Sequence, residues 1–243
     1  MASPLKQFEI LPLEGLPAFS IGGYNLSYTN SALFMTLAVA SSVLLLLLAT
    51  RKKALVPGTL QTLGEGVFRF VDNMMTDIIG KEARPFLPLI FSVFLFVLMG
   101  NMLGMLPYAF TFTSHIIVTF GLAAFLFVLI TITGFVRHGL HFFSLFLPHG
   151  TPWFVAPILV PIEVFSYFIR PITLSVRLFA NMMAGHVLLK VVVGFVAMMG
   201  LGGVFPLLMT VAFIGFEFFV AFLQAFIFTL LTCVYLKDAI HLH

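Results

Sequence analysis

The sequence contains very little charge, a single cysteine and none of several common catalytic motifs. Aspartate, glutamate, lysine and arginine make up 9% of its 243 residues, less than half the share typical of a soluble domain. Cys233, the only cysteine, excludes an internal disulfide, a CxxC redox pair and a cysteine-ligated zinc site. The absence of HExxH and GxSxG argues against an intramembrane hydrolase, and the absence of a GxxxxGKS/T motif argues against nucleotide binding.

Apolar residues are what the sequence has in abundance. They make up 61% of the chain and include 31 phenylalanines. Runs of about 20 apolar residues are long enough to cross the hydrocarbon core of a bilayer as a helix. The sequence therefore predicts an all-α integral membrane protein with about five membrane helices and one amphipathic helix.

The first part of the chain predicts an arm followed by one membrane helix. Residues 1–30 contain several prolines and glycines and lack a continuous apolar core, so we expect an extracytoplasmic arm and no cleavable signal peptide. Residues 31–53 form the first predicted span, which ends in Arg51, Lys52 and Lys53. Short loops rich in lysine and arginine stay on the cytoplasmic or matrix side, which places the N-terminus outside and the C-terminus inside. Arg137 also falls inside in this topology, and Lys6 falls outside.

Residues 58–80 form the amphipathic segment, in which apolar residues recur at helical spacing among charged ones. Two interpretations apply: a helix lying in the plane of the membrane interface, which we favour, or a helix packed on a partner. Residues 85–137 predict a hairpin of two membrane helices. Gly100 and Gly104 form a GxxxG motif, which is typical of a close helix approach. Asn101 beside them predicts an interhelical hydrogen bond, with a polar lining as the alternative.

Residues 138–153 predict a loop that contains His138, His141 and His149. Their spacing fits no established zinc motif, so we interpret them as interfacial or solvated side chains and expect no metal.

Residues 154–238 contain two helices that are too long for a perpendicular span. The apolar stretch 154–193 would be roughly twice the thickness of the bilayer as one straight helix. It either kinks into a hairpin at Pro161 or Pro171, or lies far from the membrane normal. The last helix, 205–236, has a surface rich in phenylalanine that we expect to contact lipid and neighbouring helices: Phe213, Phe216, Phe218, Phe219, Phe222, Phe226 and Phe228.

A polar face runs along the first of these helices. Its members follow the spacing of one helical face: Glu163, Ser166, Arg170, Thr173 and Arg177. Asn181 returns to the angle of Glu163, and His186 lies about half a revolution from Arg177 at ~100° per residue. A charge in the centre of a membrane helix costs roughly 2.5–3.5 kcal/mol, so such residues normally face protein or a water-filled cavity.

These residue types can supply a proton path. Arg177 keeps its proton at any accessible pH, so its role would be electrostatic, favouring the ionised form of a nearby carboxylic acid. Glu163, His186 and Glu217 can each bind and release a proton. The remaining candidates can hold water by hydrogen bonds: Asn181, Gln224, Ser166 and Thr173.

Each candidate also has a purely structural interpretation. Arg177 could form an ion pair with Glu163 or Glu217, and His186 could be an interhelical donor with Glu217 as its partner. For Arg170 and Lys190 we expect interfacial positions and no chemistry. The occurrence of these polar residues on two consecutive over-long helices favours transport.

Three segments resemble subunit a, also called subunit 6, of the F-type ATP synthases: PFLPLIFSVFLFVLMGNMLGMLP at 85–107, SVRLFANMMAGH at 175–186 and FLQAFIFTLLTCVYL at 222–236. The resemblance implies that Arg177 is the essential arginine that faces the carboxylates of the rotating c-ring. It implies a proton exit half-channel with Glu163, Ser166 and Thr173. It also implies an entrance half-channel with His186, Glu217, Asn181 and Gln224, and a strongly tilted hairpin of the last two helices along the ring.

The resemblance also implies a set of partners. These are the c-ring, subunit b of the peripheral stalk, membrane lipid and the transported protons, with no nucleic acid, no nucleotide and no cofactor bound by this chain. The chain would be a non-catalytic channel subunit. A bacterial inner membrane is favoured and the mitochondrial inner membrane is the alternative. A secondary ion transporter is the other functional class, but the inverted repeat that would favour it is not evident.

Overall fold

The computed structural model describes residues 8–13, 20–21, 24–25, 27–51, 57–106, 109–147 and 154–241. Five helices in these residues are long and apolar enough to cross a membrane, which confirms the all-α membrane fold. The two short strands β1 (Ser20–Ile21) and β2 (Tyr24–Asn25) form a small antiparallel pair in the N-terminal arm. Lys6, Lys52, Lys53 and His149 lie outside the described residues.

Helices account for most of the rest of the described chain. In order these are α1 (Asn30–Thr50), α2 (Thr59–Ile78), the 3₁₀ helix η2 (Lys81–Phe86), α3 (Leu87–Gly104), η3 (Phe112–Ser114), α4 (Ile116–His138), η4 (Gly139–Phe146), α5 (Ala156–Met198), η5 (Gly200–Gly203) and α6 (Val204–Ile240). The segment 138–153, expected to be a loop, thus contains the helix η4. Phe142 of η4 is buried in the main core, which explains why this part of the loop is ordered as a helix.

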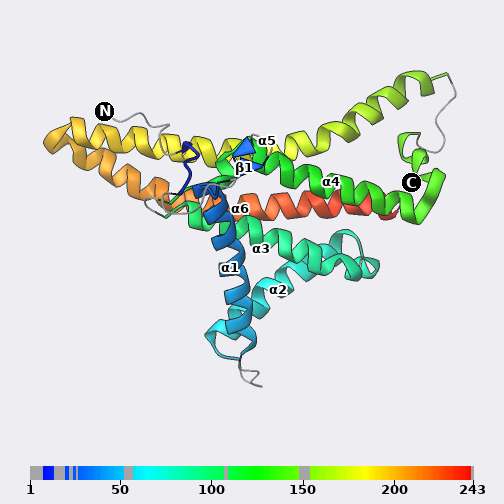
Figure 1. Cartoon of the computed structure of the whole chain (residues 1–243), viewed down its shortest axis with the longest axis horizontal. Coiled ribbons are helices and arrows are strands. Elements are labelled where there is room, and N and C mark those ends of the chain that lie inside the picture. Colours follow the sequence, from blue (N-terminus) through cyan, green and yellow to red (C-terminus); the bar gives the residue numbers. More distant parts are fainter. Residues whose placement is uncertain are drawn as a thin grey trace.

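The two longest helices, α5 and α6, form an antiparallel hairpin along the longest axis of the molecule (Figure 1). α5 is one continuous helix of 43 residues with Pro161 and Pro171 inside it, so the prolines do not make a hairpin. Proline lacks an amide hydrogen and bends a helix, and the N-terminal part of α5 slants away from α6 in Figure 1. The reversal occurs instead at η5, where Gly200 has a φ of 53° that favours glycine.

The helix α2 packs its apolar face on the chain's own core. Val71, Met74 and Met75 are buried there, and the Phe70 ring lies 5.5–6.0 Å from the Phe94, Phe222 and Phe226 rings of α3 and α6. Its opposite face carries the exposed ion pair between Glu65 and Arg69. An interfacial depth for α2 stays a prediction, because the structure shows its contacts and contains no membrane.

The GxxxG motif of α3 makes room for side chains that follow α3 in the chain. A Cβ atom at Gly100 would collide with the Phe112 ring, and a Cβ atom at Gly104 would lie 2.7 Å from the Thr111 hydroxyl. The interpretation of this motif as a helix–helix contact is therefore wrong. Asn101, in contrast, donates an interhelical hydrogen bond of 3.2 Å to the Ala221 carbonyl of α6, as predicted.

Arg170 joins α5 to α6. Its guanidinium donates to the Asp238 carboxylate at 2.9 Å and lies over the rings of Tyr167 and Tyr235, with centroid distances of 5.4 and 5.0 Å. The Tyr167 hydroxyl is in turn 2.6 Å from the Thr131 hydroxyl of α4. Arg170 thus belongs to an interhelical network next to Pro171. The sequence had suggested only an interfacial position for this side chain and did not predict the network.

This network predicts that Asp238→Asn destabilises the protein. The substitution leaves the Arg170 charge half-buried without its partner, and because both side chains retain about a quarter of their exposure we expect a loss of only about 1 kcal/mol. The midpoint of thermal unfolding in detergent measures it. Glu65→Gln, in an exposed ion pair on α2, is the matched control, and an equal shift in both variants would contradict the prediction.

The N-terminal arm is held against the start of α1 by Asn30. The Asn30 side chain donates to the Glu9 carbonyl at 3.0 Å and accepts from the Leu11 amide at 3.2 Å. Backbone hydrogen bonds from Leu13 to Tyr28 and from Asn30 to Leu11 complete the attachment.

We expect Asn30→Ala to loosen this arm, because it removes both side-chain hydrogen bonds to the arm and keeps the backbone pair. Amide hydrogen exchange at Leu11 should accelerate by roughly fivefold, the equivalent of about 1 kcal/mol. Thr36→Val, whose hydroxyl bonds within α1 and to Tyr28, serves as the control, and unchanged exchange at Leu11 would count against the attachment.

Candidate functional site

The hairpin of α5 and α6 brings polar residues together that are far apart in the sequence. Asn181 of α5 donates a hydrogen bond of 2.8 Å to the Gln224 side chain of α6. One and a half turns further along α5, the His186 Nδ1 atom lies 3.6 Å from the Glu217 Oε1 atom. The four predicted entrance residues therefore form two adjacent pairs that both cross the helix interface.

The carboxyl group of Glu217 is enclosed. Its side chain is 8% exposed, and neither oxygen has a hydrogen-bond partner among the described residues. A Cβ atom at Gly185 would lie 2.5 Å from Oε1, so the missing side chain at this position lets the carboxyl group approach α5. In this position the carboxyl group lies beside the His186 ring.

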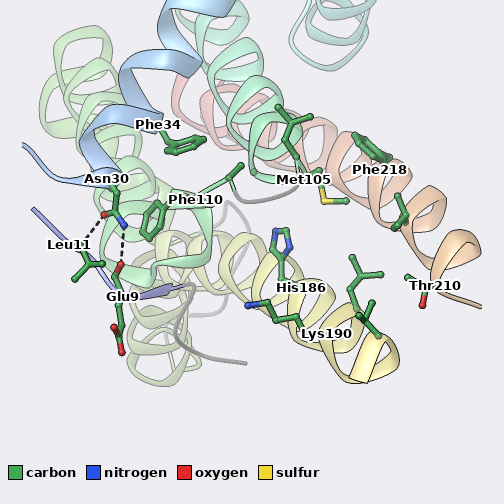
Figure 2. A pocket seen from close by; sticks show the side chains of 16 residues that line it. Glu9, Leu11, Asn30, Phe34, Met105, Phe110, His186, Lys190, Thr210 and Phe218 are labelled. Atoms are coloured by element: carbon green, nitrogen blue, oxygen red, sulfur yellow. Dashed lines mark hydrogen bonds between the residues drawn. The ribbon is translucent and has the colours of Figure 1, made fainter. Parts of the chain in front are cut away.

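His186 faces a cavity of about 880 Å³. Figure 2 shows His186 and Lys190 of α5 on one side of this cavity, and Glu9 of the N-terminal arm and Asn30 at the start of α1 on another. The Phe8 ring meets the His186 ring edge-on at 6.4 Å. The arm therefore forms part of the wall, and Lys190, to which the sequence assigned no chemistry, lies on it as well.

Two further residues around His186 had no signal in the sequence. The Thr111 hydroxyl, just before η3, lies 2.9 Å from the His186 Nε2 atom. His115, at the start of α4, stacks on the Phe110 ring of the cavity wall at 5.1 Å. Burial lowers the pKa of His115, which keeps this ring neutral at pH 7.

Buried amides continue the polar path beyond Glu217. Gln224 is 1% exposed, and Asn101 is completely buried where it bonds to Ala221, between Glu217 and Gln224 on α6. Because Asn181 bonds to Gln224, the line of polar groups reaches α5 again one turn, ~6 Å, from Arg177.

Arg177 lies on the outer surface of α5. Its side chain is exposed, and within the described ranges it forms no hydrogen bond or ion pair. The structural alternative for this residue, an ion pair with Glu163 or Glu217, is therefore not what the chain adopts.

The predicted exit residues do not form a cluster. Glu163 is half-buried, Ser166 and Thr173 are exposed, and the Thr173 hydroxyl bonds to the Arg170 carbonyl of its own helix. Along the axis of α5, Glu163 and Arg177 are ~21 Å apart. The structure places these residues along one helix face but does not bring them together.

The loop histidines do not form a metal centre in the described part of the chain. His138 bonds to the Ile240 carbonyl at the end of α6 at 3.0 Å, and His141 is exposed. Among the described residues, no three histidine, cysteine, aspartate or glutamate side chains gather as a metal site would require.

Comparison with known proteins covers nearly the whole chain. The family model described as ATP synthase A chain matches residues 32–237. Relatives named ATP synthase subunit a include one from Rhodospirillum rubrum, 51% identical over all of both chains. The relative from Pelagibacter ubique is 49% identical over 99% of this chain and 98% of its own. The one from Paramagnetospirillum magneticum is 48% identical over all of both. Together with the five candidate spans, these matches show that the chain is a multi-pass membrane protein that belongs to the ATP synthase subunit a family.

Proposed function

We propose that the chain is the proton-translocating stator subunit of a rotary ATP synthase and that Arg177 separates two offset half-channels. The observation that carries the proposal is the polar line from the cavity through the His186–Glu217 and Gln224–Asn181 pairs to a point one turn from Arg177. The family gives the coarser role, that of a channel in the membrane sector. The roles of the individual residues in this channel are what we propose.

In the entrance half-channel, protons arrive in the cavity and reach the interior through His186 and Glu217. Both groups can change their charge by one proton, whereas the side chains lining most of the cavity are apolar. Gln224, Asn181 and Asn101 then orient the path by hydrogen bonds, because amides donate and accept but do not titrate. The path ends at the outer face of α5.

Arg177 acts as a fixed charge on that face. A guanidinium does not release its proton, so it blocks direct proton flow from one half-channel to the other. Its exposed position leaves it free to meet a carboxylate of the c-ring, and the attraction favours the ionised form of that carboxylate. A c-ring carboxylic acid that approaches Arg177 therefore loses its proton. A c-ring carboxylate that moves away from Arg177 has to gain a proton from the entrance half-channel.

The exit half-channel runs along Glu163, Ser166 and Thr173 on the same helix. These residues follow one face of α5 on the N-terminal side of Arg177, while His186 lies on the C-terminal side. The opposite placement of the two routes relative to Arg177 is what makes protons travel with the ring between them.

In the proposed orientation the N-terminus lies on the periplasmic side of a bacterial inner membrane and the C-terminus lies in the cytoplasm. A proton moving inward then gains ~2.3 kcal/mol per 100 mV of membrane potential. The c-ring contacts the exposed face of α5 and α6, and subunit b of the peripheral stalk holds the chain against rotation. ATP chemistry belongs to other subunits.

Replacing Arg177 tests the central assignment. In assembled complexes, Arg177→Ala should abolish proton-driven ATP synthesis and ATP-driven proton pumping, because the fixed charge between the two routes is lost. Both activities are measured in membrane vesicles, with the amount of complex normalised by immunoblot. Coupled synthesis at the wild-type rate in this variant would refute the proposal.

Replacing Glu217 tests the entrance half-channel. Glu217→Gln keeps the shape of the side chain but cannot exchange a proton, so proton uptake from the outer side should fall by roughly tenfold or more. Uptake is followed with a pH-sensitive dye in vesicles of known orientation. Asp77→Asn, an exposed carboxylate at the end of α2, removes the same charge elsewhere, and an equal loss in both variants would contradict the path.

A further inference from the structure

The Thr111 hydroxyl lies between two groups that each require a different hydrogen-bond role from it. Its Oγ1 atom is 3.0 Å from the Gly104 carbonyl and 2.9 Å from the His186 Nε2 atom, and Thr111 is 4% exposed. Gly104 ends α3, where a carbonyl has no amide four residues further along the helix. The hydroxyl is therefore the donor that satisfies this carbonyl.

A hydroxyl has only one proton to donate. Because the Thr111 proton is committed to Gly104, its oxygen must accept a hydrogen bond from His186, and the neutral ring must then carry its proton on Nε2. In that tautomer Nδ1 has a free lone pair. Nδ1 is the atom that lies 3.6 Å from the Glu217 carboxyl oxygen, so the basic nitrogen faces the carboxyl group.

We infer that Thr111 is a positioning residue that fixes the tautomer of His186, so that a single nitrogen, Nδ1, accepts and releases each proton that enters. The inference rests on the proposed entrance route. Nδ1 takes a proton from a hydronium ion in the cavity: an O–H bond of the hydronium breaks and leaves water, and a new N–H bond forms, which gives an imidazolium. That bond then breaks while an O–H bond forms on the Glu217 carboxylate. His186 returns to its starting tautomer, and the proton on Nε2 stays bound to Thr111 throughout.

The opposite tautomer would interrupt this route. With its proton on Nδ1, the ring would donate to the Glu217 carboxylate, an attractive pairing that leaves no lone pair on the nitrogen facing Glu217. The next proton would have to bind Nε2, and the ring would have to exchange both protons to reset. Thr111 removes this alternative because its oxygen offers an acceptor to Nε2.

Other charged or titratable groups around His186 and its cavity come from four elements. Glu217 faces it from α6, Lys190 lies one turn further along α5, and Glu9 of the arm lines the same cavity. His115, stacked on Phe110 at the cavity wall, is a titratable group of the segment that leads into α4. α3 contains no charged side chain. The pH dependence of activity therefore reflects all four of these groups. For this reason the tautomer of His186 has to be measured directly and not inferred from activity.

The experiment uses the complete ATP synthase in lipid vesicles with ¹⁵N-labelled histidine. The ¹⁵N shifts of the His186 ring, identified by difference from His186→Gln, report which nitrogen carries the proton. We expect the Nε2–H tautomer in the wild type and in Thr111→Ser, which keeps the hydroxyl, and a mixed or Nδ1–H population in Thr111→Val. The wild-type spectrum does not depend on Thr111→Val, so it decides the question even if that variant fails to assemble.

Rates of ATP synthesis against the pH of the outer solution give the second readout. Thr111→Val should lower the rate by about tenfold and shift the pH at which the rate is half-maximal, and Thr111→Ser should restore both. Thr210→Val is the matched control: Thr210 lines the same cavity, but its hydroxyl donates to the Pro206 carbonyl of its own helix. Thr210→Val should behave as wild type.

An Nδ1–H tautomer in the wild type, or an unchanged tautomer and pH profile in Thr111→Val, would overturn the inference. These results leave the proposed function standing as long as Arg177→Ala is uncoupled. Coupled synthesis in Arg177→Ala would instead refute the proposed function, whatever the tautomer of His186.

Discussion

The cost of placing polar groups among apolar helices governs the structure. In such surroundings a polar side chain without a partner is expensive, so nearly every one needs a hydrogen bond or an ion pair. Asn181 bonds to Gln224, His186 to Thr111 and Arg170 to Asp238, each across an interface between elements. Glu217 and Arg177 depart from this rule. The carboxyl group of Glu217 is enclosed without a hydrogen bond, and Arg177 projects from the surface of α5.

Three contacts between α5 and α6 fix how these two long helices pair. Arg170, Asn181 and His186 follow one another along α5, while their partners Asp238, Gln224 and Glu217 follow in the reverse order along α6. This order fixes an antiparallel register over most of both helices. The Arg170 network and the His186–Glu217 pair lie 16 residues, or ~24 Å, apart on α5, so the register is fixed at two distant points of the same interface.

The sequence predicts the spans and the polar residues well, because both depend on local properties. Apolar runs of sufficient length identify the five spans, and the rarity of charge makes Arg177, His186 and Glu217 conspicuous. Helical spacing shows which residues share a face, but it cannot show which element covers that face. The pairing of Arg170 with Asp238 and the contact of Thr111 with His186 join residues 68 and 75 positions apart. The same limit explains the wrong interpretation of Gly100 and Gly104, whose free space is filled by Phe112 and Thr111.

The charge of Arg177, unpaired within the described ranges, is energetically unfavourable in the isolated chain. A guanidinium on the exposed surface of a long apolar helix, with neither an internal ion pair nor a hydrogen bond among the described residues, is costly in a membrane until an anion approaches it. A structural arginine would have been paired within the fold, as Arg170 is, because the chain can clearly supply a carboxylate to α5. That contrast between two arginines seven residues apart on one helix supports the proposal that the partner of Arg177 is a moving carboxylate of another subunit. In this proposal the encounter is transient, because each ring carboxylate that stabilises Arg177 must leave again for the ring to turn.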